Sequence, residues 1–207
     1  MTDQKTEAPA KLDVTDLILR DISAGALPPG TWLKQIDLER RYGATRPDVR
    51  RALDRLVSKR LVEHIPNRGY HVFEPDGRQA AEVADLRTII ETGVADRIVA
   101  QATPADIAAL RTLAERFDHL VLNGTVLELY EANLDFHRRL LGLCGNAELV
   151  RLVSEIRQRT SSAPVSQWRT RARIDQSSRE HHQMVDAIAA GAVDEFRRLT
   201  ALHINQG

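Results

Sequence analysis

The spacing of apolar residues near the start of the chain predicts a series of short helices. Val14, Leu17, Ile18 and Ile22 recur at helical spacing and Gly25 follows them, so we expect a helix from about Asp13 to Ala24. Residues 35–42 read as a second helix, and Gly43 as a tight turn after it. A third helix is expected from Thr45, with an apolar stripe at i, i+3, i+4 and i+7: Val49, Ala52, Leu53 and Leu56. The last two helices and their turn are typical of a helix-turn-helix.

After Lys59 the pattern changes to that of strands. Residues 61–65 and 70–73 are expected as two short strands, and residues 66–69, Pro-Asn-Arg-Gly, as the hairpin between them. A hairpin after a helix-turn-helix predicts a winged helix over residues 11–74, preceded by a disordered tail over residues 1–10. Residues 75–77, Pro-Asp-Gly, mark the expected domain boundary.

From Arg78 onward the pattern is helical throughout. The predicted helices cover residues 79–102, 104–122, 126–143, 146–160, 171–190 and 192–205. Helices joined by short loops form antiparallel bundles. The chain is therefore expected to be mainly α, with an N-terminal winged helix-turn-helix and an antiparallel six-helix bundle over residues 75–207 that binds an effector and dimerises.

Charge changes this picture because it is concentrated in one place. The whole chain has a net charge of zero, whereas residues 40–60 carry eight basic and two acidic side chains. The N-terminus is polar, no apolar stretch is long enough for a bilayer, and the single cysteine, Cys144, cannot form an internal disulfide. These features indicate a cytoplasmic protein without a membrane partner, whose Cys144 fills core space.

A basic second helix suits the DNA major groove. We expect Arg46 and Arg50 to contact bases, since arginine reaches guanine O6 and N7, and Thr45 to donate to a phosphate. Thr45 is also placed to cap the helix, with Asp48 at capping-box spacing. Asn67 and Arg68 are expected to reach phosphate or the minor groove from the wing, where Gly69 permits the tight hairpin. The alternative is an ordinary solvated charged face.

Three histidines are predicted to point into the bundle from three different helices. Asn133 and His137 lie four residues apart on one apolar face, and His181 and His203 lie on apolar faces of later helices. A single inward histidine is usually core packing, whereas three with an amide indicate a metal site. Asn133 is neutral, so the ion would keep its full charge and attract an anionic effector. His182 falls on the outer face.

Both halves resemble the GntR family of bacterial transcription regulators, in the FadR-like branch with an all-helical effector domain. Residues 27–33, LPPGTWL, match the family's l-x-P-G-x-x-L segment, and residues 43–53, GATRPDVRRAL, resemble its helix-turn-helix signature. Asp48 stands where the family usually has proline and Arg51 where it has glutamate, and Ile36 replaces a DNA-contacting arginine of some relatives. In the second half, residues 133–137 and 180–188 resemble its D/N-x-x-F-H and E-H-x-x-I patterns.

The resemblance implies a metal, a ligand and a function. In metal-binding relatives the positions of Asn133, His137, His181 and His203 hold a divalent ion, here zinc, nickel, manganese or iron. The branch takes small carboxylates as effectors, and Arg87 resembles an arginine that faces the effector pocket. An ordinary surface ion pair with Glu91 is the alternative for Arg87.

One winged helix reads too few base pairs for genomic specificity, so we expect a homodimer on a palindromic operator, acting as a repressor. Two other interpretations remain open at this point. Three histidines could activate water in a metal-dependent hydrolase, although no general base is evident beside them. The metal could also be structural only, without an effector.

Overall fold

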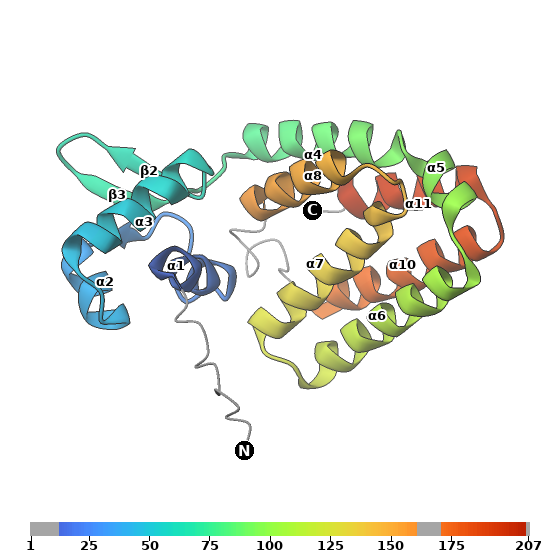
Figure 1. Cartoon of the computed structure of the whole chain (residues 1–207), viewed down its shortest axis with the longest axis horizontal. Coiled ribbons are helices and arrows are strands. Elements are labelled where there is room, and N and C mark those ends of the chain that lie inside the picture. The colour runs from blue at the N-terminus through green and yellow to red at the C-terminus, as the bar shows by residue number, and fades with distance from the viewer. Residues whose placement is uncertain (1–12, 161–170, 206–207) are drawn as a thin grey trace, which may run out of the picture.

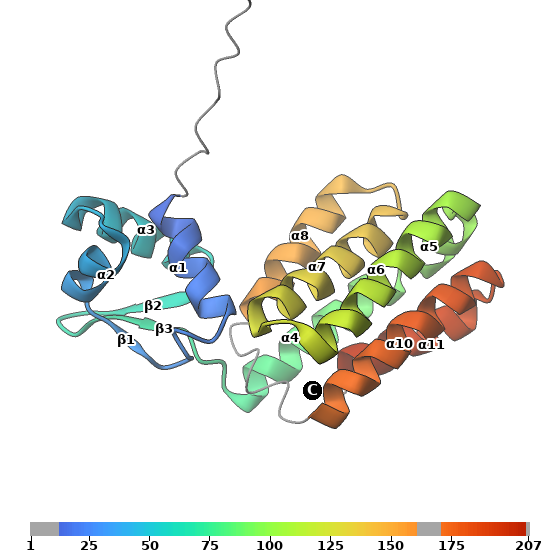
Figure 2. The ribbon, with the colours of Figure 1, turned by 90° about the horizontal axis from the view of Figure 1, so that it is seen from below.

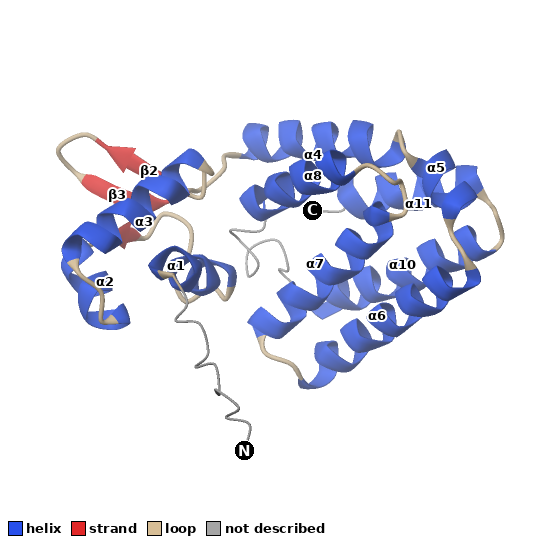
Figure 3. Cartoon of the chain, viewed as in Figure 1, coloured by secondary structure: helices blue, strands red, loops and turns tan. Residues whose placement is uncertain are grey.

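The structure, a computed structural model, describes residues 13–160 and 171–205. The predicted disordered tail over residues 1–10 lies outside them. Figure 1 shows two domains side by side, and the view in Figure 2 separates them again. Strands occur only in the N-terminal domain, as the colouring in Figure 3 makes plain for the described residues.

The N-terminal domain contains the predicted helix-turn-helix. Helix α1 (Val14–Ser23) packs on α3 (Arg46–Ser58), and α2 (Gln35–Tyr42) ends at Gly43. Gly43 adopts the left-handed conformation, with a φ of 61°, which a glycine takes without strain. The apolar stripe of α3 faces the core as predicted. Its buried members are Val49, Ala52, Leu53 and Leu56.

The wing is a three-stranded antiparallel sheet rather than the two-stranded hairpin predicted. Strands β2 (Val62–Ile65) and β3 (Gly69–Val72) form the hairpin, and β1 (Trp32–Leu33) pairs with the other edge of β3. Trp32 lies opposite His71 in this register. A strand of two residues is too short to show the alternation of apolar and polar positions typical of strands, so only its pairing with β3 reveals it.

The segments predicted as helices after the wing are helical, although the first of them is divided in two. Helix α4 (Gly77–Thr92) begins with a capping box formed by Asp76 and Gln79. The domain continues with α5 (Ala95–Gln101), α6 (Pro104–Asn123), α7 (Val126–Gly142), α8 (Ala147–Thr160), α10 (Arg171–Ala189) and α11 (Val193–Asn205). Helix α6 packs against α7 and α10, α11 packs against α10 and α4, and α4 also packs against α8.

The predicted helix over residues 79–102 is two helices. Gly93 ends α4, and Val94 has a φ of −108° and a ψ of 8°, which takes the chain out of the helical conformation before α5 begins. Glycine is a poor helix former, and the break lets the apolar residues that follow turn inward. Ala95 and Ile98 are fully buried in the core of the bundle as a result.

The apolar clusters of the two domains are separate. One lies among α1, α2, α3 and the sheet, a second among the helices from α5 onward, and a small third cluster joins Phe117 on α6 to Leu129 and Ala132 on α7. The predicted boundary at residues 75–77 falls between the end of β3 and the first turn of α4. Among the described helices, none is both long enough and apolar enough to span a bilayer.

Candidate functional site

The arginines of the helix-turn-helix differ in whether they form ion pairs with neighbouring carboxylates. Arg41, Arg51 and Arg55 form ion pairs with Asp21, Asp48 and Asp13, respectively. Arg46 and Arg50 are exposed and form none of the ion pairs found among the described residues. The two arginines predicted to contact bases are therefore the ones on α3 that form no ion pair with a described residue.

Thr45 caps α3, as its position predicted. Its hydroxyl accepts a hydrogen bond from the backbone N–H of Asp48 at 3.4 Å and donates one to Asp48 Oδ2 at 2.6 Å. A phosphate contact through this hydroxyl would require the bond to Asp48 to break. The role of Thr45 at phosphate stays a prediction.

The wing shows how Asn67, Arg68 and Gly69 form the hairpin. Asn67 and Gly69 both have positive φ, 62° and 106°, and nothing lies within 4 Å of a Cβ added to Gly69, so its φ alone favours glycine there. The Arg68 guanidinium lies over the indole ring of Trp32, 4.8 Å from the ring centroid. Sequence reasoning assigned no role to Trp32, because the contact depends on the unpredicted strand β1.

A buried tyrosine connects the wing to helix α3, the second helix of the helix-turn-helix and the expected recognition helix. The Tyr70 hydroxyl on β3 donates to Asp54 Oδ1 on α3 at 2.7 Å. Burial raises the pKa of Tyr70, and the Asp54 carboxylate raises it further, while the nearby Arg50 acts in the opposite direction. Arg50 is thus close enough to Tyr70 for the wing to influence its position.

In the second domain, His137 on α7, His181 on α10 and His203 on α11 meet in the interior. One ligand nitrogen from each lies within 4.8 Å of the others, and all three residues are buried. The Nε2 atoms of His137 and His203 are 3.0 Å apart. Asn133 lies one helical turn before His137 on the same helix. The convergence expected from the apolar faces of three helices is therefore present.

Buried polar atoms without hydrogen-bond partners indicate whether this cluster could bind a metal. Both ring nitrogens of His181 and the Oδ1 atom of Asn133 are buried without a hydrogen-bond partner among the described residues. Such atoms are costly to bury unless something binds them. Imidazole nitrogens and amide oxygens are ligands of divalent metals, so the donor set fits the predicted ion.

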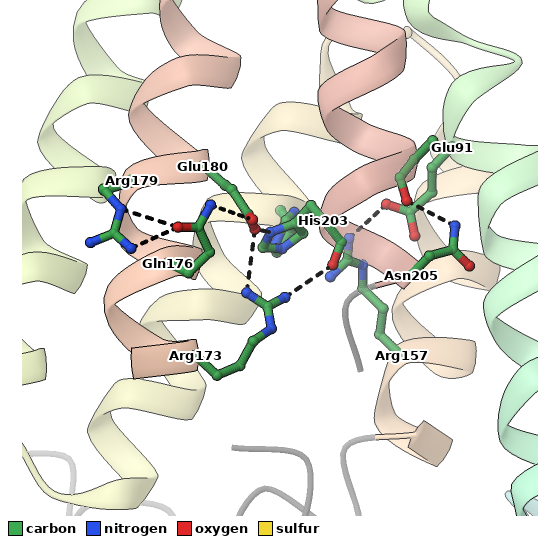
Figure 4. A network of polar contacts seen from close by, with 10 residues as sticks. Glu91, Arg157, Arg173, Gln176, Arg179, Glu180, His203 and Asn205 are labelled. Atoms are coloured by element: carbon green, nitrogen blue, oxygen red, sulfur yellow. Dashed lines mark hydrogen bonds and ion pairs between the residues drawn. The ribbon is translucent and has the colours of Figure 1, made fainter. Parts of the chain in front are cut away.

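A carboxylate outside the cluster orients one of the histidines. Glu180 Oε2 accepts a hydrogen bond from His203 Nδ1 at 2.7 Å, which directs the His203 Nε2 lone pair toward the cluster. Gln176 Nε2 donates to Glu180 at 3.0 Å, and Arg173 forms an ion pair with it (Figure 4). The sequence placed Glu180 in a motif but did not show this contact.

Electrostatics keep the three histidines neutral. Burial lowers the pKa of His137 and His181 well below the usual range, and nearby cations, Arg157 among them, lower both further. Burial also lowers the pKa of His203, although the bond to Glu180 opposes this. Neutral imidazole is the form that binds metal, so the site is ready to bind an ion at neutral pH.

The environment of Arg87 differs from the surface ion pair that the sequence offered as the alternative. Arg87 does pair with Glu91, with Nε and Oε1 2.9 Å apart, but Glu91 is only 2 % exposed, so this is not a surface pair. Arg157 on α8 donates to the other oxygen of Glu91 at 2.6 Å. Burial would raise the pKa of Glu91, but Arg157 and Arg87 outweigh it and hold that pKa below the usual range.

Arg157 is the main residue here that sequence reasoning missed. It lies 66 positions from Glu91, so no local spacing connects the two. Its burial and the neighbouring Arg87 lower its pKa to about 10, while Glu91 acts in the opposite direction. Two guanidinium groups share one carboxylate, which leaves this trio with a net positive charge close to the histidines.

Two further expectations concern single side chains. His182 bonds to Asp118 at 2.6 Å with a third of its side chain exposed, and Cys144 is fully buried in the core. His182 thus faces outward, away from the cluster that contains its neighbour His181.

A winged helix followed by a separate all-helical domain with a buried histidine cluster is the architecture of a DNA-binding regulator. Residues 10–72 match the family described as bacterial regulatory proteins, gntR family, and residues 82–206 match the FCD domain. The chain therefore belongs to the GntR family of transcriptional regulators, in the branch with an FCD domain, and is not an enzyme.

Relatives and solved structures agree with this assignment. The chain is 27% identical over 180 residues to the "Nta operon transcriptional regulator" of Aminobacter aminovorans, covering 86% of this chain and 83% of that one. It is 24% identical over 186 residues, 86% of this chain and 78% of the other, to the "Probable D-xylose utilization operon transcriptional repressor" of Paenarthrobacter nicotinovorans. The fold is similar to that of E. coli McbR/YncC, with a TM-score of 0.80 over 96% of this chain and 95% of that one at 23% identity.

Proposed function

We propose that this regulator is a cytoplasmic repressor that binds a palindromic operator as a homodimer and is controlled by a small carboxylate at a metal site in its FCD domain. The observation that carries the effector part is the set of buried, unpartnered atoms at the histidine cluster, His181 Nδ1 and Nε2 and Asn133 Oδ1. The repressor part is supported by the description of the Paenarthrobacter relative.

On the DNA side, Arg46 and Arg50 are the base contacts we propose, because they are exposed and form none of the ion pairs found on α3. Thr45, Asn67 and Arg68 supply contacts to phosphate or the minor groove, and Gly69 keeps the hairpin tight. The Tyr70–Asp54 bond fixes the wing relative to the recognition helix.

On the effector side, His137, His181 and His203 would hold a divalent ion, zinc, nickel, manganese or iron, with Asn133 as a weak further ligand. When bound, the ion supplies positive charge and open positions that attract a carboxylate. Arg87 and Arg157 both pair with the single carboxylate of Glu91 and bring two cationic groups to this part of the domain. This supports an anionic effector and extends the proposed role of Arg87 to Arg157.

The connection to DNA binding runs through α4. This helix begins directly after the linker at residues 73–76 and carries both Arg87 and Glu91, whereas Arg157 belongs to α8. An anion that competes with Glu91 for the arginines would change how α4 packs on α8. A shift of α4 moves the linker and with it the winged helix.

The test is whether carboxylates release DNA in a metal-dependent way. A duplex selected by the protein from a random-sequence pool is titrated in mobility-shift assays with acetate, malonate, succinate, lactate, malate and citrate, with added zinc or with a chelator. We expect at least one of them to weaken binding roughly tenfold with zinc, a coupling of about 1.4 kcal/mol, and none with the chelator.

His181→Ala should abolish the response to zinc and carboxylate, whereas His182→Ala, on the outer face beside Asp118, should preserve it. If no acid in the series changes DNA affinity while zinc still binds, the metal is structural and the effector proposal is wrong.

The homodimer is supported by an apolar face on α4. Ile90 packs against the core, yet Leu86 and Ile89 point outward and are 43% and 63% exposed. A helix that is apolar on both sides usually has a partner on each. We propose that this face contacts a second copy of the chain.

Replacing Ile89 with aspartate is expected to raise the dimer dissociation constant at least about thirtyfold, because a charge would be buried at the interface. Leu122→Asp is the matched control, since Leu122 is also exposed, at 72%, but lies on α6, whereas α4 packs against α8 and α11. Light scattering over a dilution series measures both. A stable Ile89→Asp dimer would show that the contact lies elsewhere.

A further inference from the structure

Trp32 is an exposed aromatic residue of the winged helix that lies near Arg46 and Arg68. Its residue is 41% exposed, although large aromatic side chains usually bury most of their surface. It lies on the edge strand β1, directly opposite His71 on β3. The Arg68 guanidinium at the wing covers its ring, 4.8 Å from the centroid.

The sheet holds the indole ring in place. Backbone bonds from Gly30 N to Val72 O and from Val72 N to Thr31 O, both 2.9 Å, fix β1 against β3. The rings of Trp32 and His71 are 5.2 Å apart, and His71 Nε2 lies 3.2 Å from Glu63 on β2. Trp32 therefore has His71 on one side and Arg68 on its face, both supported by neighbouring strands.

Arg68 shares a groove with the recognition helix. A surface groove of about 460 Å³ lies among the wing, α2 and the first residue of α3, and Trp32 forms part of its wall. Three cationic side chains line it, Lys34, Arg46 and Arg68, against the single carboxylate of Glu39. Arg46 is the first residue of α3 and one of the proposed base contacts. The groove therefore brings Arg46 and Arg68 of the wing to one cationic surface.

We propose that Trp32 is a positioning residue that holds Arg68 for contact with the DNA backbone. A free arginine loses much side-chain freedom when it binds a phosphate, whereas one already stacked on an indole has lost part of it in the free protein. Guanidinium groups stack well on tryptophan and keep their N–H donors available at the edge. Arg68 is exposed, so those donors can reach a phosphate.

This inference rests on the proposed placement of the wing on DNA, and a double-mutant cycle separates the two. The probe is the duplex selected from a random pool by the wild-type protein, and a duplex of unrelated sequence measures non-specific binding. The variants are Trp32→Ala, Arg68→Ala, the double variant, and Trp32→Phe, which keeps an aromatic face.

We expect Trp32→Ala to weaken binding to the selected duplex about two- to fivefold, the range that an exposed cation–π contact provides. Arg68→Ala should weaken it at least as much, and the double variant should bind no worse than Arg68→Ala alone. Trp32→Phe should recover most of the affinity. Thermal melting checks that each variant is folded. We expect all of them to fold, because both side chains are exposed.

The outcomes distinguish the two proposals. If Arg68→Ala binds like the wild type, the wing placement is wrong. If Arg68→Ala weakens binding but Trp32→Ala does not, or if the two effects multiply in the double variant, Trp32 does not act through Arg68. A fluorescence readout is independent of DNA: in a Trp168→Phe background Trp32 is the remaining tryptophan, and Arg68→Ala should change its emission.

Discussion

Replacing His181 with alanine is expected to abolish stoichiometric zinc binding, because both of its ring nitrogens are buried without a hydrogen-bond partner and it lies among the other two histidines. Metal analysis of zinc-loaded protein and calorimetric titration measure the loss. His182→Ala is the matched control, since it removes the adjacent imidazole, which bonds to Asp118 instead. Full zinc content in His181→Ala would mean that the histidines are core packing.

The same site gives two finer expectations. Asn133→Asp adds a negative charge to the donor set, so it should tighten zinc binding and weaken a carboxylate effector. Burial lowers the pKa of all three histidines, so the folded protein keeps them neutral below the usual imidazole range. Zinc binding should therefore persist as the pH falls through 6.5, the usual histidine value, and be lost only in more acidic solution. Unchanged zinc and carboxylate affinities in Asn133→Asp would rule out a ligand role for Asn133.

The double variant Arg46→Ala/Arg50→Ala is expected to lose about 2–6 kcal/mol of operator binding, since each base-contacting arginine contributes about 1–3 kcal/mol. Mobility-shift titrations at fixed salt with the selected and an unrelated duplex measure the loss. A base contact lowers affinity for the selected duplex far more than for the other, whereas a phosphate contact lowers both alike.

Arg198→Ala is the control for charge alone. Arg198 is an exposed arginine on α11 that pairs with Glu195, and its removal changes the net charge by the same amount as either single variant without touching the winged helix. Each single variant, Arg46→Ala and Arg50→Ala, should show roughly half of the effect of the double variant if the two act independently. Unchanged affinity of the double variant for the selected duplex would contradict the assignment of α3 as the recognition helix.

The helices and the wing hairpin could be predicted from the sequence because their causes are local. A buried stripe at Val49, Ala52, Leu53 and Leu56 requires a period of 3.6 residues, and a cap at Thr45 requires a free N–H three residues later. The inward direction of His137, His181 and His203 followed from the apolar residues around each. The break at Gly93 was missed because helical periodicity continues on both sides of it.

The contacts that give these elements a function depend on the tertiary structure. Arg157 reaches Glu91 across 66 positions, and Trp32 meets Arg68 only because β1 pairs with β3. Spacing along the chain is enough to predict most of the helices, the order of the two domains and the residues that point inward. Packing between helices and pairing between strands set which charges share a buried site and which arginine stacks on an aromatic ring, because these contacts join residues that are far apart in the sequence at no regular spacing.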